Sequence, residues 1–380
     1  MKPIIIAELE TLSDIETAIV AINANAGAAL QVSKNSVNKR KGAMHDASRL
    51  QLLVTWARAT ENPYLHFHTA NNLESVIAEL CGYAPGITAL RLSEGVKIGD
   101  QVVTRRVALQ GAADKMKNTD DLELLKIIKG RSIDMTSVSG AQRQYLRPLF
   151  SERSSKAVKD AEGMYSLLQE LNDKINQTDK NLVPESFLKA CSIFTSELFE
   201  NTQEHATHDQ VGAPYSAHVE GFIISWLQMD EDQFISDFQG HEKLKYFWNR
   251  EVKLSRNSSK KSLRCLQLSF FDSGPGFASR ATGMETNQLD RLQEREKLLA
   301  CLQKNFTTKK QTGAGQGLPG VLTALNEIGG LIRIRSGRHS IFNCFEPNKE
   351  ANIFEFEDWT DQPLAAVAGS VISLIVPLRK

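Results

Sequence analysis

A glycine-rich stretch in the last third of the chain constrains the fold most strongly. Gly313, Gly315 and Gly317 alternate with other residues directly before an apolar run that starts at Leu318 and is typical of a helix. Glycine permits backbone dihedrals that aim successive N–H groups at one point, and a helix N-terminus adds partial positive charge there. Pro319 suits the first turn of such a helix. The stretch has the form of a phosphate cradle, but one such stretch alone is a weak signal.

A predicted helix upstream carries two polar residues suited to nucleotide chemistry. Residues 190–206 have helical character, and Pro184 is placed to open the helix. The spacing puts Glu197 and Asn201 one turn apart on the same face. An asparagine carbonyl can ligate Mg²⁺ without repelling phosphate oxygens. A carboxylate beside it can orient and deprotonate an attacking water; Glu200 is the rival base.

A strand that ends in an acid lies between these two segments. Residues 266–277 contain an apolar strand that runs into Asp272 and a tight turn with Gly274 and Gly276. A buried carboxylate at this place can accept hydrogen bonds from the exocyclic amine of adenine. The alternative interpretation is an ordinary turn at the end of a strand.

Together, the three segments resemble the GHKL ATPase superfamily, which includes gyrase B, Hsp90, MutL and the ATP-binding domain of histidine kinases. Glu197-x-x-x-Asn201 resembles its first box, Asp272-x-Gly-x-Gly its second and Gly313-x-Gly-x-Gly-Leu its third, in the family's order. Residues 368–377 resemble the family's last strand. The resemblance covers roughly the C-terminal half of the chain. It implies an α+β fold with a Bergerat-type sandwich, in which helices cover a mixed, mostly antiparallel sheet.

The resemblance also implies ATP with Mg²⁺ as the ligand and assigns roles to the matching positions. Glu197 would be the catalytic base, Asn201 the Mg²⁺ ligand and Asp272 the residue that accepts from adenine. Residues 282–304 would form the ATP lid, a segment ordered by nucleotide. The other residues expected at the nucleotide are Gly274, Gly276, Lys309, Lys310, Gly313, Gly315, Gly317 and Leu318.

Two related Gly-rich motifs do not fit the third segment. A dinucleotide-binding motif needs an apolar strand before the glycines, whereas residues 307–312 are polar and lysine-rich. A P-loop needs Gly-Lys-Ser/Thr after the cradle, and here Gly317 is followed by Leu318.

Composition describes an ordinary globular protein without a strong electrostatic field. The 380 residues favour two domains or one large one, and 41% of them are hydrophobic. The 45 basic and 45 acidic side chains cancel, which argues against nucleic acid or a membrane surface as partner. Five scattered cysteines without metal-ligand spacing indicate a reducing compartment. We therefore expect a cytoplasmic protein without a membrane span.

Alternating short strands and helices in the first part predict a smaller N-terminal α/β domain, residues 1–98. We expect a linker or helical connection over residues 99–154 and the ATP-binding domain over residues 155–380. The strands predicted in the N-terminal domain lie at residues 3–7, 28–33, 64–69 and 87–92.

The N-terminal domain also has a weak resemblance to STAS (anti-anti-sigma-like) domains. Asp46-Ala-Ser-Arg-Leu resembles the turn that carries their phosphorylated hydroxyl, with Ser48 as the hydroxyl and Arg49 in place of a glycine. The alternative interpretation is an unspecified α/β domain in which Ser48 caps a helix.

Three functions remain open at this point. The first is an ATPase whose slow hydrolysis drives a lid or conformational switch that controls an unidentified protein partner, or a nucleotide-dependent homodimer. The second is a protein kinase, either of the anti-sigma serine type or with a phosphoacceptor histidine, for which His45-Asp46 lies far from Asn201. The third is a non-catalytic module in which ATP gates an interaction.

Overall fold

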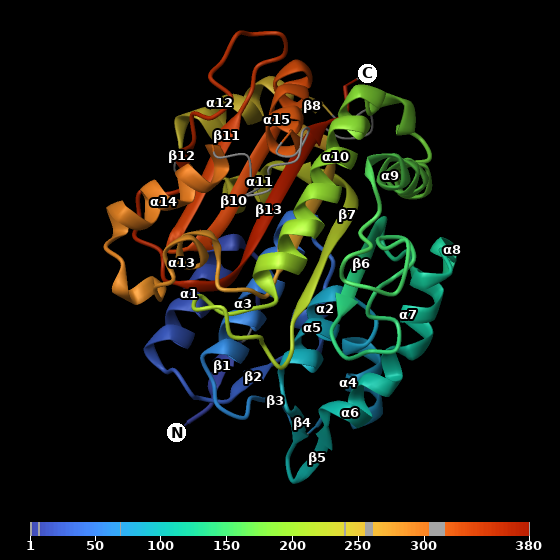
Figure 1. The fold of residues 1–380 in the computed structure, drawn as a ribbon, viewed down its shortest axis with the longest axis vertical. Coiled ribbons are helices and arrows are strands. Elements are labelled where there is room, and N and C mark those ends of the chain that lie inside the picture. Colours follow the sequence, from blue (N-terminus) through green and yellow to red (C-terminus); the bar gives the residue numbers. More distant parts are fainter. Residues whose placement is uncertain are drawn as a thin grey trace.

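The structure is a computed structural model that describes residues 2–6, 8–68, 70–238, 241–254, 261–303 and 316–379 (Figure 1). It is a mixed α and β architecture with two sheets. The strands are β1 Ile4–Ile6, β2 Leu30–Val32, β3 Tyr64–Phe67, β4 Gly95–Ile98, β5 Gln101–Thr104, β6 Ser132–Val138, β7 Val219–Asp230, β8 Lys253–Leu254, β9 Lys261–Asp272, β10 Leu331–Gly337, β11 His339–Cys344, β12 Glu357–Asp358 and β13 Val367–Pro377. The helices are α1 Leu12–Ala24, α2 Lys34–Asn38, α3 Ala43–Arg58, α4 Leu73–Leu80, α5 Ala84–Leu92, α6 Arg105–Ala108, α7 Ala113–Asp120, α8 Leu124–Ile127, α9 Ala161–Ile175, α10 Glu185–Asn201, α11 Glu231–Asp237, α12 Glu242–Glu251, α13 Phe277–Thr282, α14 Arg291–Gln303 and α15 Gly317–Ile328.

The larger sheet has eight strands among the described residues, in the order β12-β11-β10-β13-β9-β7-β6, with β8 paired to β9. Its described strand pairs are all antiparallel. The central strands β7, β9 and β13 alternate between two apolar cores. For example, Phe270 and Phe271 of β9 belong to different cores because successive side chains point to opposite faces.

One face of this sheet, here called the α10 face, is covered by α9, α10 and α15 (Figure 1). Helix α10 places Phe187, Cys191 and Phe194 in this core. Phe194 meets Phe270 of β9 edge to face at a centroid distance of 5.3 Å. Burial of several aromatic rings fixes α10 against the strands that carry the candidate site.

The opposite face of the sheet is covered by the N-terminal part of the chain, mainly by α3. Residues 43–57 of α3 are all buried, because α3 lies between the large sheet and the helices around it. Gln51 donates to the carbonyl oxygens of Arg335 (3.0 Å) and Gly369 (3.2 Å), and Met44 N–H donates to Gln267 (3.2 Å). The apolar core around α3 is continuous from the small sheet to the large one.

The small sheet has the order β1-β2-β3-β4-β5, with β1 to β4 parallel and β5 antiparallel. The predicted strands around β1, β2 and β3 are present. The predicted strand over residues 87–92 is wrong, because these residues form α5. Pro85 occupies the first turn of this helix, and periodicity does not separate a short buried strand from a short buried helix.

The segment expected as a linker, residues 99–154, contains β5, three short α-helices, one 3₁₀ helix and β6. Strand β6 pairs with β7, so this segment contributes an edge strand to the large sheet. In the described part of the chain, each helix is either too short or too polar to cross a lipid bilayer.

Candidate functional site

Helix α10 carries Glu197 and Asn201 in its last two turns. Pro184 is its N-cap residue, as expected from the sequence. After Asn201 the helix continues into a π-helical turn, Thr202–Ala206. Such turns often occur at functional sites, because the wider turn re-aims the side chains that follow it.

Glu197 joins the first and the third predicted motifs. Its carboxylate accepts hydrogen bonds from the backbone N–H groups of Gln316 and Gly317, both at 3.0 Å. A negative charge at the start of α15 is stabilised by these donors and by the helix dipole. Two segments about 120 residues apart in the sequence therefore meet at one anion-accepting helix terminus.

Gly317 and Leu318 of the third motif are packed against protein atoms. A Cβ added to Gly317 would lie 2.8 Å from Phe194 Cα and 2.9 Å from the Glu197 carboxylate. The Leu318 side chain is buried in the core of the α10 face. Only the backbone of Leu318 is therefore suited to a ligand contact. Lys309, Lys310, Gly313 and Gly315 lie outside the described residues.

Asp272 ends β9, as predicted, and its carboxylate accepts from a backbone N–H group of the turn that follows and from one of β13. Gly274 N–H donates to Asp272 at 2.8 Å, and Ser370 N–H is a second backbone donor. Burial nevertheless raises the pKa of Asp272 to about 6 because desolvation outweighs these hydrogen bonds and the attraction of Arg58.

Gly274 and Gly276 serve the packing of the turn. A Cβ on Gly274 would lie 2.8 Å from Ala206, so the glycine allows the turn to contact the end of the π-helical segment. Gly276 has a φ of 86°, which favours glycine, and a Cβ there would lie 2.8 Å from the Ser336 hydroxyl. At both glycines, which we expected to lie at the nucleotide, protein atoms occupy the space that a Cβ would take.

A small cavity on the α10 face lies between α10 and the ends of β7, β9 and β13. Its volume is about 20 Å³, which is room for about one water molecule. Asp272 lies on its wall together with residues of the first motif helix and of neighbouring strands. The full lining is Leu198, Phe199, Thr202, Glu220, Gly221, Phe270, Phe271, Asp272, Phe277, Ser370 and Ile372.

Glu220 is the residue of this cavity that the sequence analysis missed. It lies on β7 directly opposite Asp272 of β9 and is 2% exposed. Gln203 donates to its Oε1, whereas its Oε2 is buried without a hydrogen-bond partner among the described residues. Burial, and then the nearby charge of Asp272, raise the pKa of Glu220 to about 8. The sequence signal that could have indicated Glu220 is an acidic residue near the start of an otherwise apolar strand.

Arg58 of α3 supports the turn after Asp272 from the opposite side of the sheet. Its guanidinium donates to the Ser273 carbonyl at 3.0 and 3.2 Å and to the Ala217 carbonyl at 2.9 Å. It also lies over the Tyr215 ring, 3.7 Å from the centroid. The N-terminal part of the chain thus contacts the second motif directly, which sequence patterns did not indicate.

Asn201 is partly exposed and is followed by Thr202, which lines the cavity. Among the described residues no group of three or more His, Cys, Asp or Glu side chains is arranged to hold a metal ion. An Mg²⁺ ion at Asn201 would therefore need most of its oxygen ligands from a bound phosphate.

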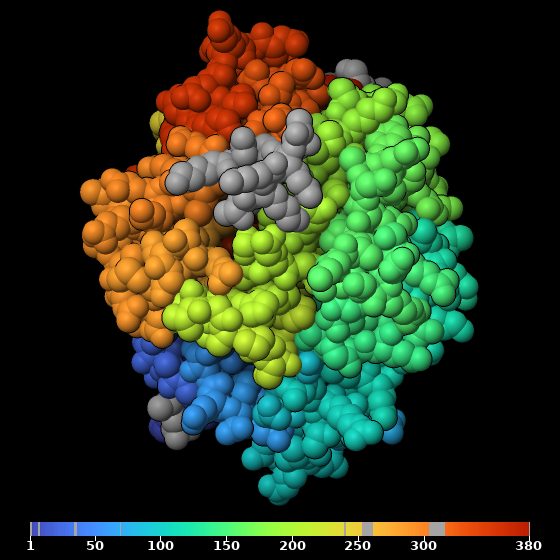
Figure 2. Space-filling view, in the orientation of Figure 1, coloured from blue at the N-terminus to red at the C-terminus, as the bar shows by residue number. Residues whose placement is uncertain are grey.

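The described part of the predicted lid segment, residues 282–303, packs against the rest of the protein. Helix α14 buries Leu298 and Leu302 in the core of the α10 face. Its Glu294 is buried and accepts a hydrogen bond from Arg338 Nε at 2.6 Å. Figure 2 shows this face of the molecule, with α10 in yellow-green and α13 and α14 in orange.

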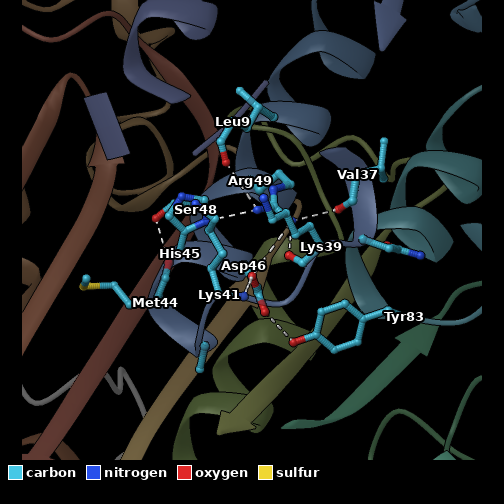
Figure 3. Close-up of polar contacts among 12 residues, drawn as sticks. Leu9, Val37, Lys39, Lys41, Met44, His45, Asp46, Ser48, Arg49 and Tyr83 are labelled. Carbon is cyan, nitrogen blue, oxygen red and sulfur yellow. Dashed lines mark hydrogen bonds and ion pairs between the residues drawn. The ribbon is translucent and has the colours of Figure 1, made fainter. Parts of the chain in front are cut away.

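The candidate phosphoacceptors of the N-terminal part are buried inside α3 (Figure 3). Ser48 is not a cap, because α3 begins after Gly42; its hydroxyl donates to the Met44 carbonyl at 2.8 Å and accepts from Arg333 at 3.3 Å. His45 is 1% exposed and lies 3.2 Å from Arg49. Burial and the positive charge of Arg49 lower the pKa of His45 well below its usual range.

Figure 3 also shows the polar contacts that indicate a structural role for the side chains around His45 and Ser48. Arg49 donates to the carbonyl oxygens of Val37, Lys39 and Leu9. Asp46 accepts from Tyr83 Oη at 2.8 Å and from Lys41 N–H at 3.0 Å. These bonds satisfy buried backbone groups of the loops around α3 and leave neither side chain at a surface.

No family model matches the chain, and neither a curated protein nor a solved structure matches it.

Proposed function

We propose that the protein binds ATP with Mg²⁺ in the manner of the GHKL superfamily, with a Bergerat-type sandwich formed by the large sheet and the helices of its α10 face. The observation that carries this proposal is the contact of Glu197 with the start of α15. It brings the first and third motifs together, and the cavity that contains Asp272 adjoins the same helix α10.

The residues present fit a bound ATP molecule in two respects. The backbone N–H groups at Gln316 and Gly317 already hold a carboxylate, so this helix terminus is suited to anionic oxygens. Glu220 lines the cavity that would take the base, and its Oε2 is a buried polar atom without a partner in the described structure. Adenine is larger than the cavity, so base binding requires the lining side chains to move.

Each first-motif residue has a distinct task in this proposal. The amide oxygen of Asn201 would hold a Mg²⁺ ion that arrives with the triphosphate. Glu197 accepts a proton from the water that attacks the terminal phosphate. Because Glu197 now occupies the helix terminus, phosphate binding there would release its carboxylate to act on that water. Slow hydrolysis would then change the contacts of α15 and control a protein partner.

Binding is tested by calorimetry with a non-hydrolysable ATP analogue. The wild-type protein should bind it only with Mg²⁺, and Asp272→Asn and Asn201→Ala should weaken binding about tenfold or more. Glu327→Gln, an exposed substitution at the far end of α15, is the control and should bind normally. Absence of magnesium-dependent binding to the wild-type protein would contradict the proposal.

Phosphate release separates the three functions. Glu197→Gln should bind ATP but lose phosphate release, whereas unchanged release would show that Glu197 is not the base. If γ-labelled ATP transfers its label to this chain or to a captured protein, the function is a kinase. If binding occurs without release or transfer, the protein is an ATP-gated interaction module. A pull-down from native lysate with and without the analogue would identify the partner.

A further inference from the structure

Two acidic side chains face one another at the end of the cavity. Glu220 and Asp272 are directly opposite on the antiparallel strands β7 and β9, so their side chains project from the same face of the sheet. Both line the cavity, and Glu220 is 2% exposed. Two buried carboxylates at neighbouring positions cannot both carry a charge without a large cost, so the pair favours one shared proton.

The surroundings place that proton on Glu220. Asp272 accepts from two backbone N–H groups, those of Gly274 and Ser370, and the positive charge of Arg58 also favours its charged form. Among the described residues, Glu220 receives one hydrogen bond, from the neutral amide of Gln203 in the π-helical turn, and Asp272 is the charged group that acts on it. Burial raises the pKa of Glu220 to about 8 and that of Asp272 to about 6.

The orientation of Glu220 follows from its one hydrogen bond. Gln203 Nε2 donates to Oε1, which fixes this oxygen as an acceptor. Oε2 has no partner among the described residues, and Glu220 lines the cavity. A protonated carboxyl therefore presents an O–H donor at Oε2, on the same face of the sheet as the acceptor Asp272. A buried donor without a partner is costly, so the position is prepared for a ligand acceptor.

We propose that Glu220 and Asp272 together read the edge of a 6-aminopurine: the protonated Oε2 of Glu220 donates to the ring nitrogen N1, and the Asp272 carboxylate accepts from the exocyclic amine. This inference rests on the proposed function and names the residue that sets its base specificity. A 6-oxopurine offers the opposite pattern, an N1–H group beside an oxygen. Neither the Glu220 donor nor the N1–H group of such a base would then have a partner.

Base specificity is tested on the full-length protein with ATP and ITP, which differ only at this edge. At neutral pH ATP should bind about tenfold to a hundredfold more tightly than ITP, because the mismatch leaves buried polar groups unpaired. Equal binding of the two nucleotides would overturn the inference while leaving the proposed function standing. If neither nucleotide binds, the proposed function itself fails.

Proton involvement is tested by the pH dependence of ATP binding. Affinity for ATP should fall by about tenfold for each pH unit above about 8, because binding needs the proton on Glu220. In Glu220→Gln the amide oxygen can accept from Gln203 while its N–H₂ group donates at the former Oε2 position. This variant should lose the decline of ATP affinity above pH 8, because an amide does not titrate.

The control Glu327→Gln, exposed on α15, should keep the wild-type pH profile, including any effect of ATP's own ionisation. An identical profile in Glu220→Gln and wild type would contradict the role of Glu220. The infrared band of protonated carboxyl groups in the free protein should also lose intensity in Glu220→Gln. An unchanged band intensity would show that the proton resides elsewhere.

Discussion

Arg58 shows how one side chain links the N-terminal part of the chain to the candidate site. Its planar guanidinium reaches the carbonyl oxygens of Ser273 and Ala217 together, and these residues flank the Asp272 turn and the start of β7. Ser273 is buried, so water cannot replace the Arg58 guanidinium as the donor if this side chain is removed. A lysine has no fork of fixed geometry and cannot make the same set of bonds.

We predict that Arg58→Ala lowers the free energy of unfolding by about 1–3 kcal/mol, because two partly enclosed carbonyl oxygens lose their donor. Binding of ATP should weaken as the turn after Asp272 loosens. Denaturant unfolding and calorimetry measure the two effects. Arg106→Ala, at an exposed position of α6, should change stability by less than about 0.5 kcal/mol. A similar small change in Arg58→Ala would refute the proposed support.

Glu220 also makes stability depend on pH. Its pKa is about 8 in the folded protein and has an ordinary value of 4.5. Between about pH 5 and 8 the folded state keeps a proton that the unfolded state has lost, so stability falls as pH rises, by about 1.4 kcal/mol per pH unit for this group. The raised pKa of Asp272 adds to the slope in the same direction up to about pH 6.

We predict that Glu220→Gln removes most of this slope between about pH 6 and 8, because an amide does not titrate. The variant should be more stable than the wild type at about pH 8 and similar to it near pH 5. Denaturant unfolding across this pH range provides the measurement. Parallel pH profiles for the two proteins would show that Glu220 is not protonated in the folded state.

At the scale of elements, the contact between α10 and α15 positions the first and third motifs. The helices approach so closely at Gly317 that no side chain fits there. Further along the same helix, an added Cβ at Gly320 would meet no heavy atom of the described residues within 4 Å. The two glycines of α15 therefore have different roles, although both lie in its first turn or just after it.

We predict opposite effects for alanine at these positions. Gly317→Ala should destabilise the protein by about 1–3 kcal/mol, because its Cβ would overlap the Phe194 backbone and the Glu197 carboxylate. Gly320→Ala should stabilise it by about 0.5–1 kcal/mol, because alanine favours helix and its Cβ would contact no described heavy atom. Thermal unfolding of both variants tests this pair. Stabilisation by Gly317→Ala would mean that α10 and α15 are further apart.

At the scale of the whole molecule, α3 packs both against the N-terminal part of the chain and against the large sheet. It packs with α1 and α5 of the N-terminal part and contacts the large sheet through Gln51, Met44 and Thr55. One continuous apolar core contains Trp56 of α3 and Val371 of β13. A continuous core favours one cooperative unfolding transition.

We predict that the N-terminal strands and the large sheet unfold together. Amide hydrogen exchange of β3 and β9 should lose protection at the same denaturant concentration. Gln51→Ala should shift both midpoints equally, because it removes donors to β10 and to the start of β13. Earlier loss of protection in β3 would indicate that residues 1–98 form a separate domain.

Local patterns were sufficient for the elements that carry the three motifs. Pro184 opens α10, Asp272 ends β9, and α15 starts at Gly317, one residue before the predicted start. These features depend on periodicity, turn residues and helix-start signals, which act between near neighbours in the sequence. The strand predicted over residues 87–92 is wrong, because these residues belong to α5 and a short buried run lacks the length to show its period.

The partners of these motifs were decided by long-range packing. Glu197 lies at the terminus of α15, Glu220 is opposite Asp272, and Arg58 reaches the same turn from α3. Each pairing joins residues that are far apart in the chain, and strand register alone places Glu220 beside Asp272 instead of one position away. One sequence can therefore predict which residue types are available for nucleotide chemistry. Their distances, burial and proton affinities exist only after the sheet and its two covering layers have assembled, because desolvation and neighbouring charges come from other segments.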